Sequence, residues 1–161
     1  YYPLYCSLEQ AQVFTEAKEG IPQILNILRS AIKFSNLPGK ENFAKDNSRE
    51  DITTMAGDAL KAFCAELDKP LIIFFDEIDS LQNGTLISFL RQLRNGYITR
   101  SRIPFPHSIA LVGMRNIRDY KSKIREARPW KEKVYWKTEV YPEERSEDGR
   151  KGGRTIHVVG V

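Results

Sequence analysis

The chain has 161 residues, of which 41% are hydrophobic and 29% charged, a balance typical of one globular domain with room for a hydrophobic core. Its formal net charge of +4 is too small to indicate a nucleic-acid partner by itself, and no apolar run has the length of a membrane span. Cys6 and Cys64 have neither metal-ligand spacing nor the pattern of a disulfide framework, so we expect reduced, buried thiols in a cytoplasmic protein without a membrane partner.

The first part of the sequence predicts one strand and two helices. Residues 1–6 are short and aromatic-rich, which is typical of a strand. Residues 9–18 predict a short helix that Gly20 stops, and Pro22 suits the first turn of a second helix. The second helix carries one apolar stripe, made of Ile21, Ile24, Leu25, Leu28, Ala31 and Ile32.

The middle of the sequence alternates helices with a strongly apolar strand. Ser48 and Asp51 form a capping-box pair that announces a helix ending at Lys69-Pro70. Residues 71–75 are apolar at every position, as expected of a parallel strand covered on both faces. Asn83 and Thr85 are candidate caps of the next helix, whose apolar stripe is Leu86, Phe89, Leu90, Leu93 and Tyr97.

The remaining elements complete an α/β pattern. Residues 108–113 predict a second buried strand, followed by a helix over 116–128. Strands that alternate with helices favour an α/β fold: a three-layer parallel sheet with flanking helices. Residues 134–141 and 155–161 then predict two strands of a short C-terminal β-hairpin-like tail. We therefore divide the sequence into a core, residues 1–128, and a tail, residues 129–161.

Two carboxylates follow the most apolar strand. Asp76 and Glu77 come directly after residues 71–75, at the carboxyl end of a strand, where open α/β sheets bind their ligands. In nucleotide hydrolysis the first carboxylate, Asp76, would hold Mg²⁺ through a water molecule, and Glu77 would orient and polarise the attacking water. The alternative is an ordinary acidic loop at the end of a strand.

The surrounding residues carry a resemblance to a known family. Asp76-Glu77-Ile78-Asp79 gives an Asp-Glu-x-Asp pattern, and residues 104–116 lead through a second apolar strand into Arg115 and Asn116. On these motifs, residues 1–128 resemble an AAA-type P-loop ATPase domain, and more narrowly the AAA-like ATPases of bacterial proteins of unknown role. The resemblance implies that residues 74–77 are the Walker B segment, with Asp76 and Glu77 binding the cofactors ATP and Mg²⁺. It also implies a sensor-1 strand ending near Gly113, with Arg115 or Asn116 near the γ-phosphate.

One part of the family pattern is missing. The sequence contains no Gly-x-x-x-x-Gly-Lys-Ser/Thr, the loop whose backbone amides and lysine bind phosphate. In the family this loop precedes the strand that residues 1–6 match, so we expect it upstream of the sequence and expect these residues alone to be inactive. A degenerate, non-binding homologue is the alternative. The missing P-loop strand would border the strand at 108–113, and residues 156–159 are a candidate cover for that edge.

Basic residues are concentrated between positions 91 and 128. This stretch holds ten lysines and arginines against two acidic residues: Arg91, Arg94, Arg100, Arg102, Arg115, Arg118, Lys121, Lys123, Arg125 and Arg128 against Asp119 and Glu126. A solvated surface, nucleic-acid phosphate binding and an arginine finger for a neighbouring subunit are the three interpretations. By resemblance the finger is Arg125 or Arg128, in a homo-oligomer. The alternative function is a nucleotide-independent DNA- or protein-binding module.

The two histidines, His107 and His157, are isolated in the sequence and predict no site.

Overall fold

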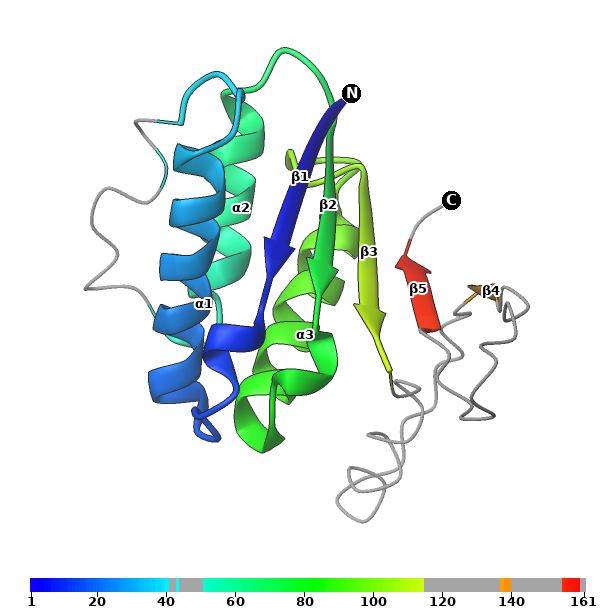
Figure 1. Ribbon diagram of the computed structural model, residues 1–161. Helices are drawn as coiled ribbons and strands as arrows, with labels where there is room; N and C mark the ends of the chain where they lie inside the picture. Colours follow the sequence, from blue (N-terminus) through cyan, green and yellow to red (C-terminus); the bar gives the residue numbers. More distant parts are fainter. Residues whose placement is uncertain (41–42, 44–50, 115–136, 140–154, 160–161) are drawn as a thin grey trace.

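The computed structural model shows an α/β fold in which a parallel sheet is flanked by helices (Figure 1). It describes residues 1–40, 43, 51–114, 137–139 and 155–159. The predicted helix over 116–128 lies outside these residues, as do Arg115, Asn116, Arg125 and Arg128.

Three parallel strands form the centre of the sheet. They are β1 (Tyr2–Ser7), β2 (Leu71–Asp76) and β3 (Ser108–Gly113), with β2 in the middle. Two further strands, β5 (Thr155–Val159) and β4 (Lys137–Glu139), extend the sheet beyond β3 to give the order β1-β2-β3-β5-β4. Both added pairings are antiparallel, and the β4–β5 pairing agrees with the predicted β-hairpin-like tail.

The tail covers the edge of β3 that we expected to be left open by the missing P-loop strand. β5 pairs with β3 along its whole length, from Ile109 opposite Val159 to Gly113 opposite Thr155. An uncovered edge of this kind offers unpaired backbone groups to other chains, and a paired neighbour removes that liability. The predicted cover by residues 156–159 is therefore confirmed.

The three described α-helices cover one face of the sheet. They are α1 (Ala17–Lys33), α2 (Met55–Ala65) and α3 (Asn83–Thr99), and they pack against one another beside β1 and behind β2 (Figure 1). Because the chain steps in the same direction from β1 to β2 to β3, two right-handed crossovers place their helices on the same face. The described residues thus form two layers, and the second helical layer of the expected three-layer arrangement is not among them.

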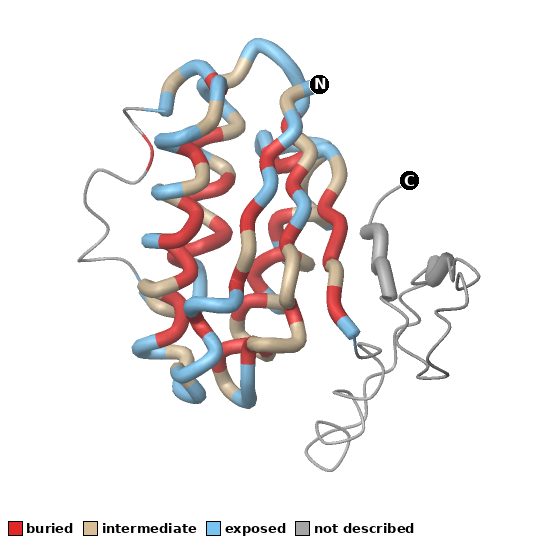
Figure 2. Tube along the Cα trace, viewed as in Figure 1, coloured by how far each residue is buried: buried red, intermediate tan, exposed pale blue. Residues whose placement is uncertain are grey.

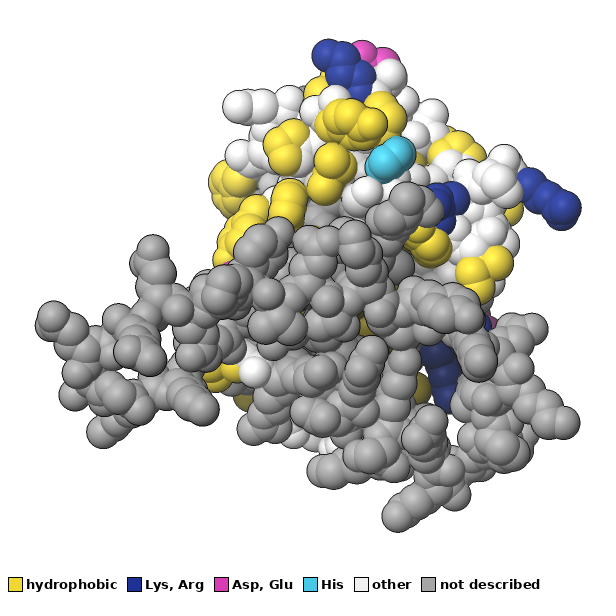
Figure 3. Space-filling view, turned by 90° about the vertical axis from the view of Figure 1, so that its right-hand side faces the viewer, with side chains coloured by type: hydrophobic (Ala, Val, Ile, Leu, Met, Phe, Trp, Pro, Cys, Tyr) yellow, Lys and Arg dark blue, Asp and Glu magenta, His cyan; other side chains and the backbone are white. Residues whose placement is uncertain are grey.

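Burial alternates along the strands as this arrangement requires (Figure 2). Ile73 and Phe75 of β2 face the helices and are fully buried, and the Phe75 ring packs edge-on against Phe89 of α3. On the opposite face Tyr5 is 63% exposed and Phe74 is 41% exposed. The prediction that β2 is covered on both faces is therefore wrong at Phe74. Viewed from the side of β3, exposed hydrophobic side chains gather in the upper part of the molecule (Figure 3).

The predicted break at Gly20 is also wrong. Residues 9–16 contain only a short 3₁₀ turn, η1 (Glu9–Ala11), and α1 begins at Ala17 and continues through both Gly20 and Pro22. A Cβ atom at Gly20 would overlap the side chain of Thr85, so this glycine permits a close approach of α1 to α3. Pro22 lies near the start of α1, where its missing N–H costs one hydrogen bond.

The expected caps of α3 have other roles. Thr85 is fully buried, and its hydroxyl donates a hydrogen bond to the Phe14 carbonyl at 2.9 Å. Asn83 is the first residue of α3 and has a positive φ of 42°. Neither side chain caps the helix, and Thr85 instead contacts the segment before α1. At α2, Ser48 of the proposed capping box lies outside the described residues, while the Asp51 carboxylate accepts a hydrogen bond from the Thr53 N–H at 2.8 Å.

Candidate functional site at the carboxyl edge of the sheet

The carboxyl ends of the three parallel strands meet at one edge of the sheet. β1 ends at Ser7, directly opposite Asp76 at the end of β2, and β3 ends at Gly113. Parallel strands necessarily bring their carboxyl ends to the same edge, which is where α/β proteins bind ligands. The predicted pair therefore lies at this edge, with Asp76 as the last residue of the central parallel strand and Glu77 directly after it.

Two hydrogen bonds hold the Asp76 carboxylate. The Tyr5 hydroxyl donates to Oδ2 at 2.6 Å, and the backbone N–H of Glu77 donates to Oδ1 at 2.9 Å. Each carboxylate oxygen has two acceptor positions, so both oxygens keep one for a further donor. Tyr5 was not among the predicted site residues, because no motif connects it to the acidic pair and only the register of β1 on β2 brings the two together.

Glu77 has a backbone conformation that glycine normally adopts. Its φ of 57° and ψ of 39° lie in the left-handed helical region. A non-glycine residue held in such a sparsely populated region costs on the order of 1–3 kcal/mol, and strain of this kind concentrates at functional sites. The sharp turn directs the chain away from β2 immediately after Asp76.

The strain at Glu77 predicts a gain in stability on substitution by glycine. Glu77→Gly and Glu77→Ala both remove the carboxylate, but only glycine adopts the left-handed conformation without steric cost. We expect the glycine variant to be about 1 kcal/mol more stable than the alanine variant in urea unfolding. Equal unfolding midpoints for the two variants would show that the backbone at Glu77 is not strained.

The third carboxylate of the acidic pattern, Asp79, links the turn after β2 to the end of β3. Asp79 lies in the 3₁₀ turn η2 (Ile78–Ser80), and its Oδ2 accepts a hydrogen bond from the Met114 N–H, just beyond β3, at 3.3 Å. A Cβ atom at Gly113 would lie 2.6 Å from Asp79 Oδ1, so glycine at this position leaves room for the carboxylate. Ser80 donates a hydrogen bond to the Leu8 carbonyl at 2.9 Å, which ties the same turn to the end of β1. The turn after Glu77 is thus fixed to both neighbouring strands.

The described residues do not enclose a metal ion by themselves. Within the described ranges no three His, Cys, Asp or Glu side chains are close enough to act as a ligand set. Asp76 can still accept a hydrogen bond from a metal-bound water through its remaining acceptor positions. The residues present therefore fit an outer-sphere role for Asp76 toward Mg²⁺, in which phosphate and other groups supply the remaining ligands.

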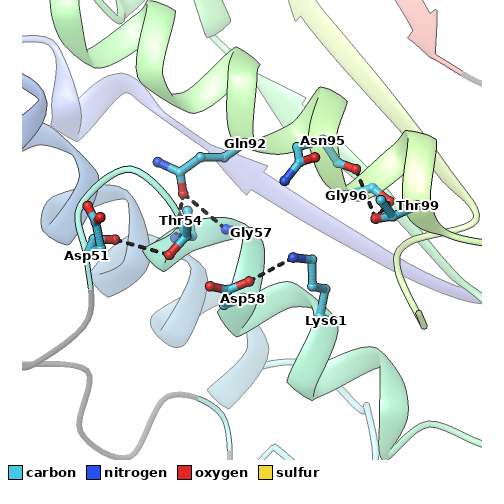
Figure 4. Close-up of polar contacts among 10 residues, drawn as sticks. Asp51, Thr54, Gly57, Asp58, Lys61, Gln92, Asn95, Gly96 and Thr99 are labelled. Atoms are coloured by element: carbon cyan, nitrogen blue, oxygen red, sulfur yellow. Dashed lines mark hydrogen bonds and ion pairs between the residues drawn. The ribbon is translucent and has the colours of Figure 1, made fainter. Parts of the chain in front are cut away.

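Two described arginines of the basic stretch, Arg91 and Arg100, border different hollows of the molecule. Arg91 borders a small polar cavity of about 190 Å³ between α2 and α3, close to the ion pair of Lys61 and Asp58 at 2.8 Å (Figure 4). Arg100 follows the other end of α3, where its guanidinium lies 3.5 Å from the centre of the Tyr97 ring and borders a separate cleft of about 700 Å³. These two arginines therefore serve different parts of the molecule. The members of the stretch from 115 onward lie outside the described residues.

The two cysteine thiols stay protonated, and His107 lies away from the acidic pair. Cys6 and Cys64 are both free, and burial raises the pKa of each thiol to about 12, so both stay protonated at neutral pH. His107 Nδ1 lies 3.0 Å from the Ser108 hydroxyl at the start of β3, which is the edge of the sheet opposite Asp76. None of the helices in the described ranges combines the length and apolar character needed to cross a membrane.

No protein-family model, curated protein or solved structure matches the chain. The function is therefore inferred from the geometry at the carboxyl edge of the sheet and from the resemblance that the acidic segment carries.

Proposed function

We propose that the chain supplies the Walker B part of an AAA-type domain that binds and hydrolyses ATP. The observation that carries the proposal is the position of Asp76, at the carboxyl end of the central parallel strand, followed directly by Glu77 in a strained left-handed conformation. Asp76 would accept a hydrogen bond from a water molecule of the bound Mg²⁺, and Glu77 would polarise the attacking water. Mg²⁺, when bound with ATP, would neutralise charge that develops on the phosphates.

An AAA-type site also needs a phosphate-binding loop, and these 161 residues contain no Gly-x-x-x-x-Gly-Lys-Ser/Thr. In the AAA-type arrangement the P-loop strand borders the sensor-1 strand, which here corresponds to β3. β5 lies along that edge of β3 in the antiparallel direction. A P-loop strand could therefore join this sheet at β3 only by displacing β5. By themselves, the 161 residues should bind nucleotide weakly.

Because we expect weak nucleotide binding, the test needs a method that detects binding at millimolar concentrations of nucleotide. Mn²⁺ replaces Mg²⁺ beside ATP and broadens the NMR signals of nearby amides. We expect Mn²⁺–ATP to broaden selectively the amide signals of residues 76–80 and 113–114. We expect the same titration to leave these signals sharp in Asp76→Asn, because the amide side chain lacks the negative charge that attracts a hydrated cation.

Two controls define the outcome. Titration with Mg²⁺–ATP is the first control, because Mg²⁺ binds in the same way but does not broaden the signals. Titration with Mn²⁺ alone is the second control, and it measures binding of the cation in the absence of nucleotide. Uniform broadening across the sheet, or selective broadening around Lys61 and Arg91 that Asp76→Asn does not change, would contradict the proposal. The second pattern would favour a phosphate-binding surface unrelated to the acidic pair.

A further inference from the structure

Tyr5 is the one residue outside the acidic segment whose side chain is hydrogen-bonded to Asp76 in the described structure. Strand register explains the contact. Tyr5 lies opposite Phe74, and side chains two residues apart on a strand share a face, so Phe74 and Asp76 point the same way as Tyr5. The phenol ring lies along the open face of the sheet, 63% exposed, while its hydroxyl reaches Asp76 Oδ2 at 2.6 Å.

We propose that Tyr5 is a positioning residue that orients the Asp76 carboxylate for a metal-bound water. The inference rests on the proposed function and adds a group that the acidic motif does not contain. The Glu77 N–H fixes Oδ1 from the backbone side, and the Tyr5 hydroxyl fixes Oδ2 from the neighbouring strand. Together they restrain rotation of the carboxylate about its last bond. The remaining acceptor positions of the two oxygens therefore have a fixed orientation toward a metal-bound water at the carboxyl edge of the sheet.

The short distance supports this role. A hydroxyl that donates to an ionised carboxylate at 2.5–2.7 Å makes a charge-assisted hydrogen bond, roughly twice as strong as a neutral one. Groups that hydrogen-bond to a metal-ligating carboxylate set its orientation, and their removal typically weakens metal binding about 10–100-fold. Asp76 would act on the cation through a water molecule, so we expect an effect at the low end of that range. Tyr5 acts through Asp76, so its removal should weaken cation binding without removing the charge that attracts the cation.

The same strand provides a matched control. Near the start of β1, the Tyr2 hydroxyl donates to Asp68 Oδ1 at 2.7 Å, in a second exposed tyrosine–aspartate hydrogen bond. This pair lies at the opposite edge of the sheet from Asp76. If tyrosine–aspartate pairs on β1 only stabilise the strand, Tyr2→Phe and Tyr5→Phe should have the same effects. A positioning role predicts that only Tyr5→Phe alters the site.

The experiment compares the Mn²⁺–ATP titrations of the wild-type chain, Tyr5→Phe and Tyr2→Phe. We expect Tyr5→Phe to need about tenfold more Mn²⁺–ATP for the same broadening of the residue 76–80 signals. We expect Tyr2→Phe to match the wild-type chain. Amide spectra and thermal unfolding should show both variants folded, because each substitution removes only an exposed hydroxyl group.

The possible failures are distinguishable. Absence of selective broadening at residues 76–80 in the wild-type chain would overturn the proposed function and this inference with it. Selective broadening that depends on Asp76 but is unchanged or stronger in Tyr5→Phe would overturn the role of Tyr5 alone. Equal weakening in Tyr5→Phe and Tyr2→Phe would also overturn it, because both hydroxyls would then act through general stability.

Discussion

Replacing Gly96 with alanine is expected to destabilise the protein by about 2 kcal/mol. A Cβ atom at this position of α3 would overlap the ring of Phe105. That ring is buried, and its residue lies between Pro104 and Pro106, whose fixed φ angles restrict how far the connector can adjust. Overpacking a core contact costs about 1–3 kcal/mol, which exceeds the roughly 1 kcal/mol that alanine gains over glycine inside a helix.

Gly57→Ala is the matched control. Gly57 also lies inside a helix, α2, but a Cβ atom there would be 3.5 Å from its nearest neighbour, the Gln92 carbonyl oxygen, which is an ordinary contact. We expect this variant to gain about 0.5–1 kcal/mol from helix propensity alone. Urea unfolding of both variants measures the difference. A stabilising effect of both substitutions would show that Phe105 moves aside and that α3 does not approach the connector closely.

The glycines also show where prediction of the fold from sequence succeeds and fails. The three parallel strands were predictable from local composition: residues 71–75 and 108–113 are apolar runs with distinct ends, and residues 1–6 are rich in aromatic side chains. We predicted a helix end at Gly20 because glycine has a low local helix propensity. In the structure this glycine instead leaves room for the side chain of Thr85 in α3. Such a contact joins positions 65 residues apart, and no local pattern records it.

Phe74 illustrates a second limit. An unbroken apolar run indicates burial on both faces, yet Phe74 is substantially exposed, because both crossovers place their helices on the other face. The direction in which the chain steps along the sheet decides this, and that direction depends on strand order rather than composition. The described residues therefore leave an apolar face open at the same side on which Tyr5 reaches Asp76.

The candidate site also combines features that the sequence predicts with features that only the folded structure reveals. Asp76 and Glu77 were predictable because their position after an apolar run is a local property of the sequence. The left-handed backbone of Glu77 and the hydrogen bond from Tyr5 depend on the turn after β2 and on the register between β1 and β2. Arg115 and Asn116, the predicted γ-phosphate sensors, lie outside the described residues, so their role remains a prediction.

Gln92→Leu is expected to destabilise the protein by about 3 kcal/mol. Gln92 of α3 is 3% exposed, and its Oε1 accepts hydrogen bonds from the Ala56 and Gly57 N–H groups at 2.8 and 3.2 Å (Figure 4). Its Nε2 donates to the Ile52 carbonyl at 2.8 Å. Leucine has a similar size but leaves these buried backbone groups without partners, at about 1–3 kcal/mol for each unsatisfied group.

The same substitution tests how α2 is held against α3. The N-cap residue of α2, Thr54, makes no side-chain capping bond, so a side chain from another helix satisfies the first free amides of α2. We expect hydrogen exchange at Ala56 and Gly57 to accelerate in Gln92→Leu more than exchange in the centre of β2. Asn95→Ala, an exposed position one turn along α3, should change stability by less than about 0.5 kcal/mol. Uniform acceleration across the protein would mean that Gln92 contributes only to global stability, whereas local acceleration would identify it as the cap that fixes where α2 begins.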